Sequence, residues 1–119
     1  MLLLLGAEDG LLRTRRMAAT LGITLETLAA LLRVNKNSVS GDGPGATVQT
    51  RMSEVARILS RAAGLMENGD GGEAGRAVLW FRNQPLVGFG GLTAMELVGE
   101  GKSKAVMEHL GRLEDGGYA

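Results

Sequence analysis

Apolar residues recur every three or four positions along most of this chain, which is the spacing of one face of an α-helix. A compact stripe of this kind is Leu25, Leu28, Ala29 and Leu32. A longer stripe begins at Thr47 and ends near Met66, with apolar positions at Val48, Met52, Val55, Ile58 or Leu59, and Ala62. Each stripe predicts an amphipathic helix that packs on a core.

Breaking and capping residues predict shorter helices in the rest of the first half. Residues 11–19 form an expected first helix, on which Leu12, Arg16 and Ala19 share a face. Gly22 ends this helix, and Thr24 can cap the next one. A short third helix is expected within residues 33–40 after a tight turn, with Val39 pointing inward.

The second half of the chain has its own start and stop signals. A helix is expected over residues 74–81, followed by a loop rich in Pro and Gly. Thr93 and Glu96 have the spacing of a capping box, in which each side chain bonds the backbone N–H of the other residue. Gly99 and Gly101 end the helix that follows, and Ser103 can cap a last helix with one apolar face, Val106, Leu110 and Leu113.

Two glycine-rich stretches interrupt the helices, residues 41–45 (Gly-Asp-Gly-Pro-Gly) and residues 68–72 (Asn-Gly-Asp-Gly-Gly). The second coincides with a change in charge. Residues 1–64 carry eight Lys/Arg and five Asp/Glu, a balance of +3, and residues 65–119 carry five and eight, a balance of −3. We therefore predict two units, residues 1–67 and residues 73–119, with any nucleic-acid contact in the first.

The composition favours a helical fold. Of 119 residues, 45% are hydrophobic and 3% aromatic, so the core has to be built from aliphatic side chains. This suits close-packed helices, and the expected fold class is all-α. Cysteine is absent, which fits a reducing cytoplasm. Residues 2–5, all leucine, are too few to span a bilayer and follow no basic segment, so we expect a cytoplasmic protein without a membrane segment.

The sequence contains no recognisable catalytic motif. It has no cysteine nucleophile, no Gly-x-Ser-x-Gly elbow and no phosphate-binding Gly-Lys-Thr, and its one histidine, His109, cannot form a multi-histidine metal site. We expect His109 to be a surface residue and residues 88–91 to be a tight turn. A small enzyme is the least favoured class of protein, and we expect no catalytic residue, metal ligand or cofactor.

Residues 25–40 have the pattern of a helix-turn-helix, in which the second helix presents its first side chains to DNA base edges. The candidates for base contact are Asn35, Lys36, Asn37 and Ser38. Arg33 and Arg51 suit the flanking phosphates. The alternative is an ordinary solvated turn, which a polar stretch of this length also forms.

Two aromatic residues of the second half each have two interpretations. Trp80 is either a core residue, whose replacement by Ala should cost about 3 to 5 kcal/mol, or an anchor in a protein interface. Tyr118 lies in the terminal stretch Gly-Gly-Tyr-Ala, residues 116–119. This stretch is either an arm that fills a partner's pocket or a disordered end.

A longer motif spans much of the chain. It contains Thr50-Arg51-Met52, then Trp80 and Pro85, then residues 91–102 (GLTAMELVGEGK), and finally Val106, Leu110 and Gly117-Tyr118-Ala119. In order and spacing it resembles the Xre/MbcA/ParS-type antitoxins that accompany RES-domain toxins. The resemblance runs from about Leu12 onward. It implies an atypical helix-turn-helix unit followed by a small helical toxin-binding unit.

The resemblance also implies partners and site residues. The toxin would consume NAD, by ADP-ribosylating a cellular target or by degrading the dinucleotide, and the C-terminal unit would cover its active-site entrance. The residues expected at that contact are Trp80, Lys102, Gly117, Tyr118 and Ala119. A homodimer that forms a hetero-oligomer with the toxin and represses its own operon at operator DNA is also implied. The alternative function is a stand-alone helix-turn-helix transcriptional repressor, with tight and steeply salt-dependent DNA binding.

Overall fold

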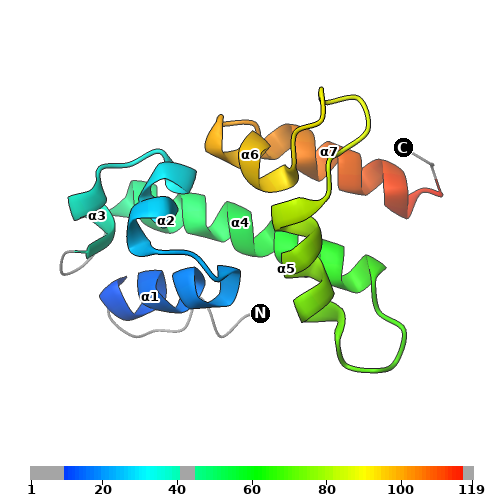
Figure 1. The fold of residues 1–119 in the computed structure, drawn as a ribbon, viewed down its shortest axis with the longest axis horizontal. Helices are drawn as coiled ribbons and strands as arrows, with labels where there is room; N and C mark the ends of the chain where they lie inside the picture. The colour runs from blue at the N-terminus through cyan, green and yellow to red at the C-terminus, as the bar shows by residue number, and fades with distance from the viewer. Residues whose placement is uncertain (1–9, 41–44, 117–119) are drawn as a thin grey trace.

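The fold is built from α-helices. The computed structural model describes residues 10–40 and 45–116, and the all-α class predicted from the composition is confirmed. The helices in these residues are α1 (Gly10–Leu21), α2 (Leu25–Leu32), α3 (Lys36–Ser40), α4 (Ala46–Leu65), α5 (Glu73–Asn83), α6 (Ala94–Gly99) and α7 (Ser103–Glu114) (Figure 1). The leucine run at residues 2–5, the loop residues 41–44 and the end of the chain at 117–119 lie outside the described residues.

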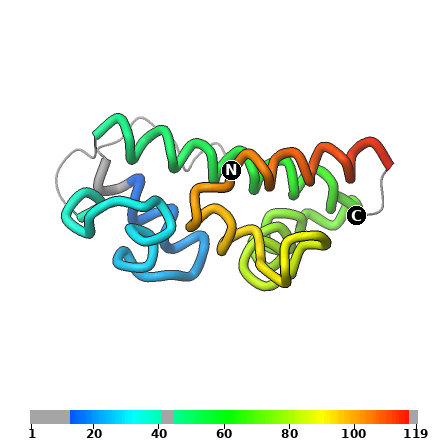
Figure 2. Tube along the Cα trace, turned by 90° about the horizontal axis from the view of Figure 1, so that it is seen from above, coloured from blue at the N-terminus to red at the C-terminus, as the bar shows by residue number. Residues whose placement is uncertain are grey.

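The other helices are arranged around α4, which is 20 residues long. Helices α1, α2 and α3 gather around its N-terminal half, and α5 crosses its C-terminal half (Figure 1). α7 packs along α4, and α6 contacts both α2 and α7. Viewed from above, α4 and α7 run along one side of the molecule and the remaining helices lie along the other (Figure 2).

A single continuous cluster of buried apolar side chains receives residues from each of these helices. Its members are almost all aliphatic, and Phe81 is the aromatic residue buried in it. The predicted boundary at residues 68–72 is the loop between α4 and α5, and the segments on either side of this loop share the core. Because each segment is short, sharing a core gives both more buried apolar surface than either has alone.

The loop between α4 and α5 is held by Arg76. Its guanidinium donates hydrogen bonds to the Asp70 carboxylate at 2.9 and 3.1 Å and to the Met66 carbonyl at 2.8 Å. The Asp70 carboxylate also accepts the Gly72 N–H at 2.8 Å. These hydrogen bonds, that of Arg76 first, lower the pKa of Asp70 below its ordinary value. The glycine-rich stretch is therefore a hydrogen-bonded connection that fixes the start of α5 against the end of α4.

The buried face of α1 differs from the predicted one. Arg16 and Ala19 are exposed, and the buried residues are Thr14, Met17, Ala18 and Leu21. The Thr14 hydroxyl donates to the Val39 carbonyl at 2.9 Å, so its polar atom is satisfied within the core. A polar threonine on the buried side interrupts the apolar pattern of this helix in the sequence. Val39 is fully buried, as predicted.

Two of the three predicted helix caps are confirmed. The Thr24 side chain accepts the Thr27 N–H at the start of α2, and Thr93 and Glu96 form both hydrogen bonds of the capping box on α6. The third was wrong by one position, because Lys102 is the N-cap of α7 and Ser103 is its first residue. The Ser103 hydroxyl instead lies 3.3 Å from a carboxylate oxygen of Glu54 on α4 and donates to it.

Neighbouring aromatic residues on α5 should contribute unequally to stability. Phe81 is fully buried, whereas Trp80 is only partly buried against the core. We expect Phe81→Ala to lower the free energy of unfolding by about 3 to 5 kcal/mol. Trp80→Ala should cost less, because its ring already contacts solvent. Urea denaturation of both variants measures this, and an equal or larger loss for Trp80→Ala would contradict it.

Candidate partner-binding sites

The predicted base-reading residues lie together at the start of α3. The Asn35 side chain accepts the Asn37 N–H at 2.9 Å and so caps the helix, and the Lys36 ammonium lies 3.3 Å from the Glu26 carboxylate. Asn35, Lys36 and Asn37 are exposed, and Ser38 is partly buried. The structure therefore brings these side chains to one surface, as a DNA contact requires, and a solvated turn has the same geometry.

Arg33 and Arg51 bind backbone carbonyls within the molecule. Arg33 ends α2 in the left-handed conformation, with φ 57°. Its guanidinium donates to the Val98 carbonyl of α6 at 2.6 Å. The Arg51 guanidinium donates to the carbonyls of Leu32 and Arg33 at 2.9 and 3.0 Å. Both cations therefore stabilise carbonyl groups at helix ends, where a positive charge is favourable.

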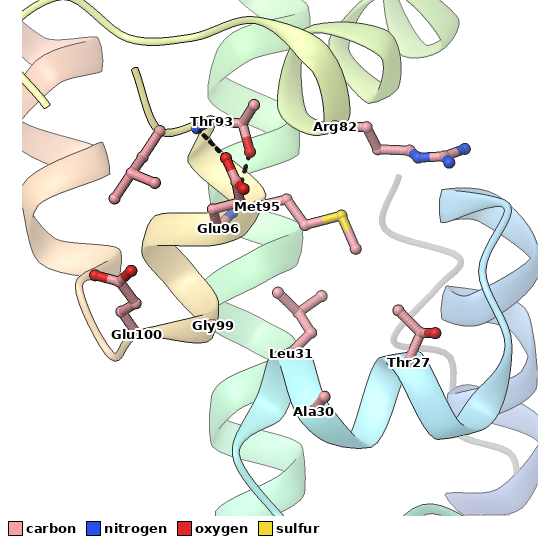
Figure 3. Close-up of a pocket in the computed structure, with 10 residues that line it drawn as sticks. Thr27, Ala30, Leu31, Arg82, Thr93, Met95, Glu96, Gly99 and Glu100 are labelled. Carbon is pink, nitrogen blue, oxygen red and sulfur yellow. Dashed lines mark hydrogen bonds between the residues drawn. The ribbon is translucent and has the colours of Figure 1, made fainter. Parts of the chain in front are cut away.

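A groove lies where α2, α5 and α6 meet (Figure 3). It encloses about 570 Å³. The α2 side is formed by Thr27, Ala30 and Leu31, and the opposite side by Arg82 of α5 together with Leu92, Thr93, Met95, Glu96, Gly99 and Glu100. Its floor is mostly apolar and its edges carry charged side chains. The groove thus joins residues about 50 to 70 positions apart in the sequence, and no local sequence pattern indicates it.

Arg82 is the cation at the edge of this groove (Figure 3). One of its terminal nitrogens lies 3.0 Å from the place that a Cβ would take at Gly22, whose φ is +69°. A side chain at position 22 would therefore be strained in its backbone and would crowd the guanidinium. From the sequence alone, Arg82 is only a basic residue in the last turn of a helix. Its position next to α2 arises from the tertiary fold.

Of the residues predicted to contact a toxin, the structure describes Trp80 and Lys102. Trp80 is partly buried on α5, and Lys102 is exposed between α6 and α7, where its ammonium lies 3.2 Å from the Glu100 carboxylate. Gly117, Tyr118 and Ala119 lie outside the described residues. Because α7 separates Lys102 from Asp115 and has 12 residues, it places them at opposite ends of a helix about 18 Å long.

Comparison with known protein families identifies the C-terminal part of the chain. Residues 70–116 match the family described as the antitoxin Xre/MbcA/ParS C-terminal toxin-binding domain. This segment is similar to the toxin-binding domain of such antitoxins, and we call it the toxin-binding domain. It comprises α5, α6 and α7. No curated protein and no solved structure matches the chain.

This match supports the role of an antitoxin with a toxin as its partner. Within the described residues, no group of three or more His, Cys, Asp or Glu side chains could hold a metal ion. Among the described helices, none is both long and apolar enough to cross a membrane.

His109 of the toxin-binding domain is buried, with 3% of its surface exposed, which corrects the expectation of a surface residue. Its ring meets the edge of Phe89 with ring centres 6.1 Å apart and planes at 83°. Its Nδ1 is buried and has no hydrogen-bond partner among the described residues. Burial, and then the charge of Arg112, lower the pKa of His109 below its ordinary value of 6.5.

The lowered pKa predicts a loss of stability in acid. The unfolded chain takes up a proton at His109 near pH 6.5, whereas the folded chain resists it, so the unfolded state binds more protons. The free energy of unfolding should begin to fall below about pH 6.5 and stop falling once the pH is below the lowered pKa of the folded state. Urea denaturation of the wild type and His109→Leu between pH 8 and about pH 5 measures this difference. Parallel pH profiles for the two proteins would contradict it.

Proposed function

We propose that this antitoxin neutralises a toxin of the RES-domain class by covering the entrance to an active site that consumes NAD. The observation that carries the proposal is the match of residues 70–116 to an antitoxin toxin-binding domain. The structure supports it by showing that α5, α6 and α7 pack on a common core with the N-terminal helices. The domain is therefore a pre-formed surface, and binding a toxin with it does not require folding first.

A second role, repression of its own operon, is supported by the exposed side chains at the start of α3. In a homodimer, two such helices could read the two halves of a palindromic operator. The guanidinium groups of Arg33 and Arg51 donate to carbonyls inside the molecule, and both residues remain partly exposed as candidates for phosphate contact. A stand-alone repressor, which uses this surface without any toxin, is the competing function.

Co-expression with the product of the adjacent gene tests the proposal. We expect the two proteins to purify as one complex and the antitoxin to suppress NAD loss in an assay of the purified toxin. The molar mass of the complex, measured by light scattering, gives its stoichiometry. A chain that captures no partner, and instead binds its operator with an affinity that falls steeply with salt, would identify the stand-alone repressor.

The end of the chain should contribute to inhibition more than to folding. Residues 116–119 follow α7, and the buried core ends at Leu110. We expect deletion of residues 116–119 to raise the concentration of antitoxin that halves NAD consumption by about tenfold or more, with an unchanged melting temperature. Replacement of residues 116–119 by Gly-Ser-Gly-Ser, which keeps the length of the chain, is the matched control and should weaken inhibition as much as the deletion. Full neutralisation by the four-residue deletion would overturn this role.

A further inference from the structure

The groove between α2 and α6 crosses the boundary of the recognised domain. Its α6 and Arg82 side lies within residues 70–116, whereas Thr27, Ala30 and Leu31 belong to the N-terminal helices. A partner seated in this groove therefore contacts both parts of the chain at once. The family match by itself assigns no binding role to α2.

The two sides of the groove are fixed to each other before a partner arrives. The Arg33 guanidinium, at the end of α2, donates to the Val98 carbonyl near the end of α6 at 2.6 Å. The other end of α6 is held by its capping box, with the Thr93 N–H donating to Glu96 at 2.9 Å and the Glu96 N–H donating to Thr93 at 3.1 Å. The first bond joins the two sides of the groove and the capping box stiffens its α6 side, so the groove loses little conformational entropy when it is filled.

The chemistry of the groove defines what fits it. Ala30 is exposed on the α2 side, and Met95 and Leu92 are partly buried opposite, so the floor accepts an apolar side chain. The carboxylate of Glu96 is used by the capping box and that of Glu100 by Lys102. Arg82 is exposed and bonds to no residue in the described part of the chain. Within the described residues, the groove therefore presents an unpaired guanidinium beside an apolar floor, and the negative charge of Glu96 remains at the start of α6.

We infer that the toxin docks in this groove, inserting an apolar side chain over Ala30 and Met95 and placing a carboxylate against Arg82. The toxin is the occupant because the charged edge and one whole side of the groove belong to the toxin-binding domain. Helix α2 is then part of the toxin contact, and the antitoxin recognises its partner with both halves of its chain. The inference rests on the antitoxin role proposed above.

Substitutions in the groove of the full-length chain test this inference. Ala30→Arg fills the floor with a charged side chain, and Arg82→Glu reverses the charge at the edge. We expect each to weaken toxin affinity, measured by calorimetry with the co-expressed toxin, by about tenfold or more. Arg82→Gln should weaken it less than Arg82→Glu, because it removes the attraction without adding repulsion. Ser60→Arg, which adds the same side chain at an exposed position of α4, is the matched control.

The outcomes distinguish a failure of the proposed docking groove from a failure of the proposed antitoxin function. Circular dichroism shows whether each variant is folded. If Ala30→Arg does not fold, the toxin affinity of Arg82→Glu alone tests the inference. If the wild type binds no toxin, the proposed function fails and the inference fails with it. If the wild type and both folded variants bind with equal affinity, only the groove is wrong. If Ala30→Arg converts a free dimer into a monomer and leaves toxin affinity unchanged, the groove holds a second copy of the chain, which also overturns the inference.

Discussion

The structure depends on the long helix α4, whose apolar side chains are buried against two groups of helices at once. Buried positions continue along it from Val48 to Ala63, and α2, α5 and α7 all pack against it. Since neither group is long enough to form a large core alone, this shared helix makes one core out of two predicted units. The relation of the toxin-binding domain to the N-terminal helices follows from this arrangement.

Two arginines stabilise the junction that α4 creates. Arg51 of α4 binds the carbonyls at the end of α2, and Arg33 extends from there to α6. The left-handed conformation of Arg33 costs about 1 to 2 kcal/mol. A hydrogen bond from a charged donor is worth about 1.5 to 3 kcal/mol, and less where solvent reaches it. The three bonds to carbonyls thus offset the backbone cost, and an arginine can occupy a position that usually favours glycine.

The candidate surfaces have different degrees of support from the sequence. The start of α3 is predictable, since Asn and Lys side chains next to a tight turn favour exposed positions. The match of residues 70–116 likewise follows from a pattern of residues in order. The groove could not be predicted in this way, because it is lined by both α2 and α6 and no local sequence pattern indicates that these helices are neighbours. Arg82 and Ala30 become meaningful only once these helices are placed together.

The sequence by itself determined the helices, because period, glycine breaks and the caps at Thr24 and Thr93 act within a few residues of one another. The tertiary structure decided how deeply the side chains outside the predicted apolar stripes are buried and what the charged ones bind. Phe81 and Trp80 are adjacent aromatic residues, yet Phe81 is fully buried and Trp80 only partly buried against the core. His109 is buried with its ring against the edge of Phe89, and Arg33 reaches the Val98 carbonyl because α6 lies beside the end of α2. Burial and pairing depend on contacts between distant segments, which short-range patterns do not contain.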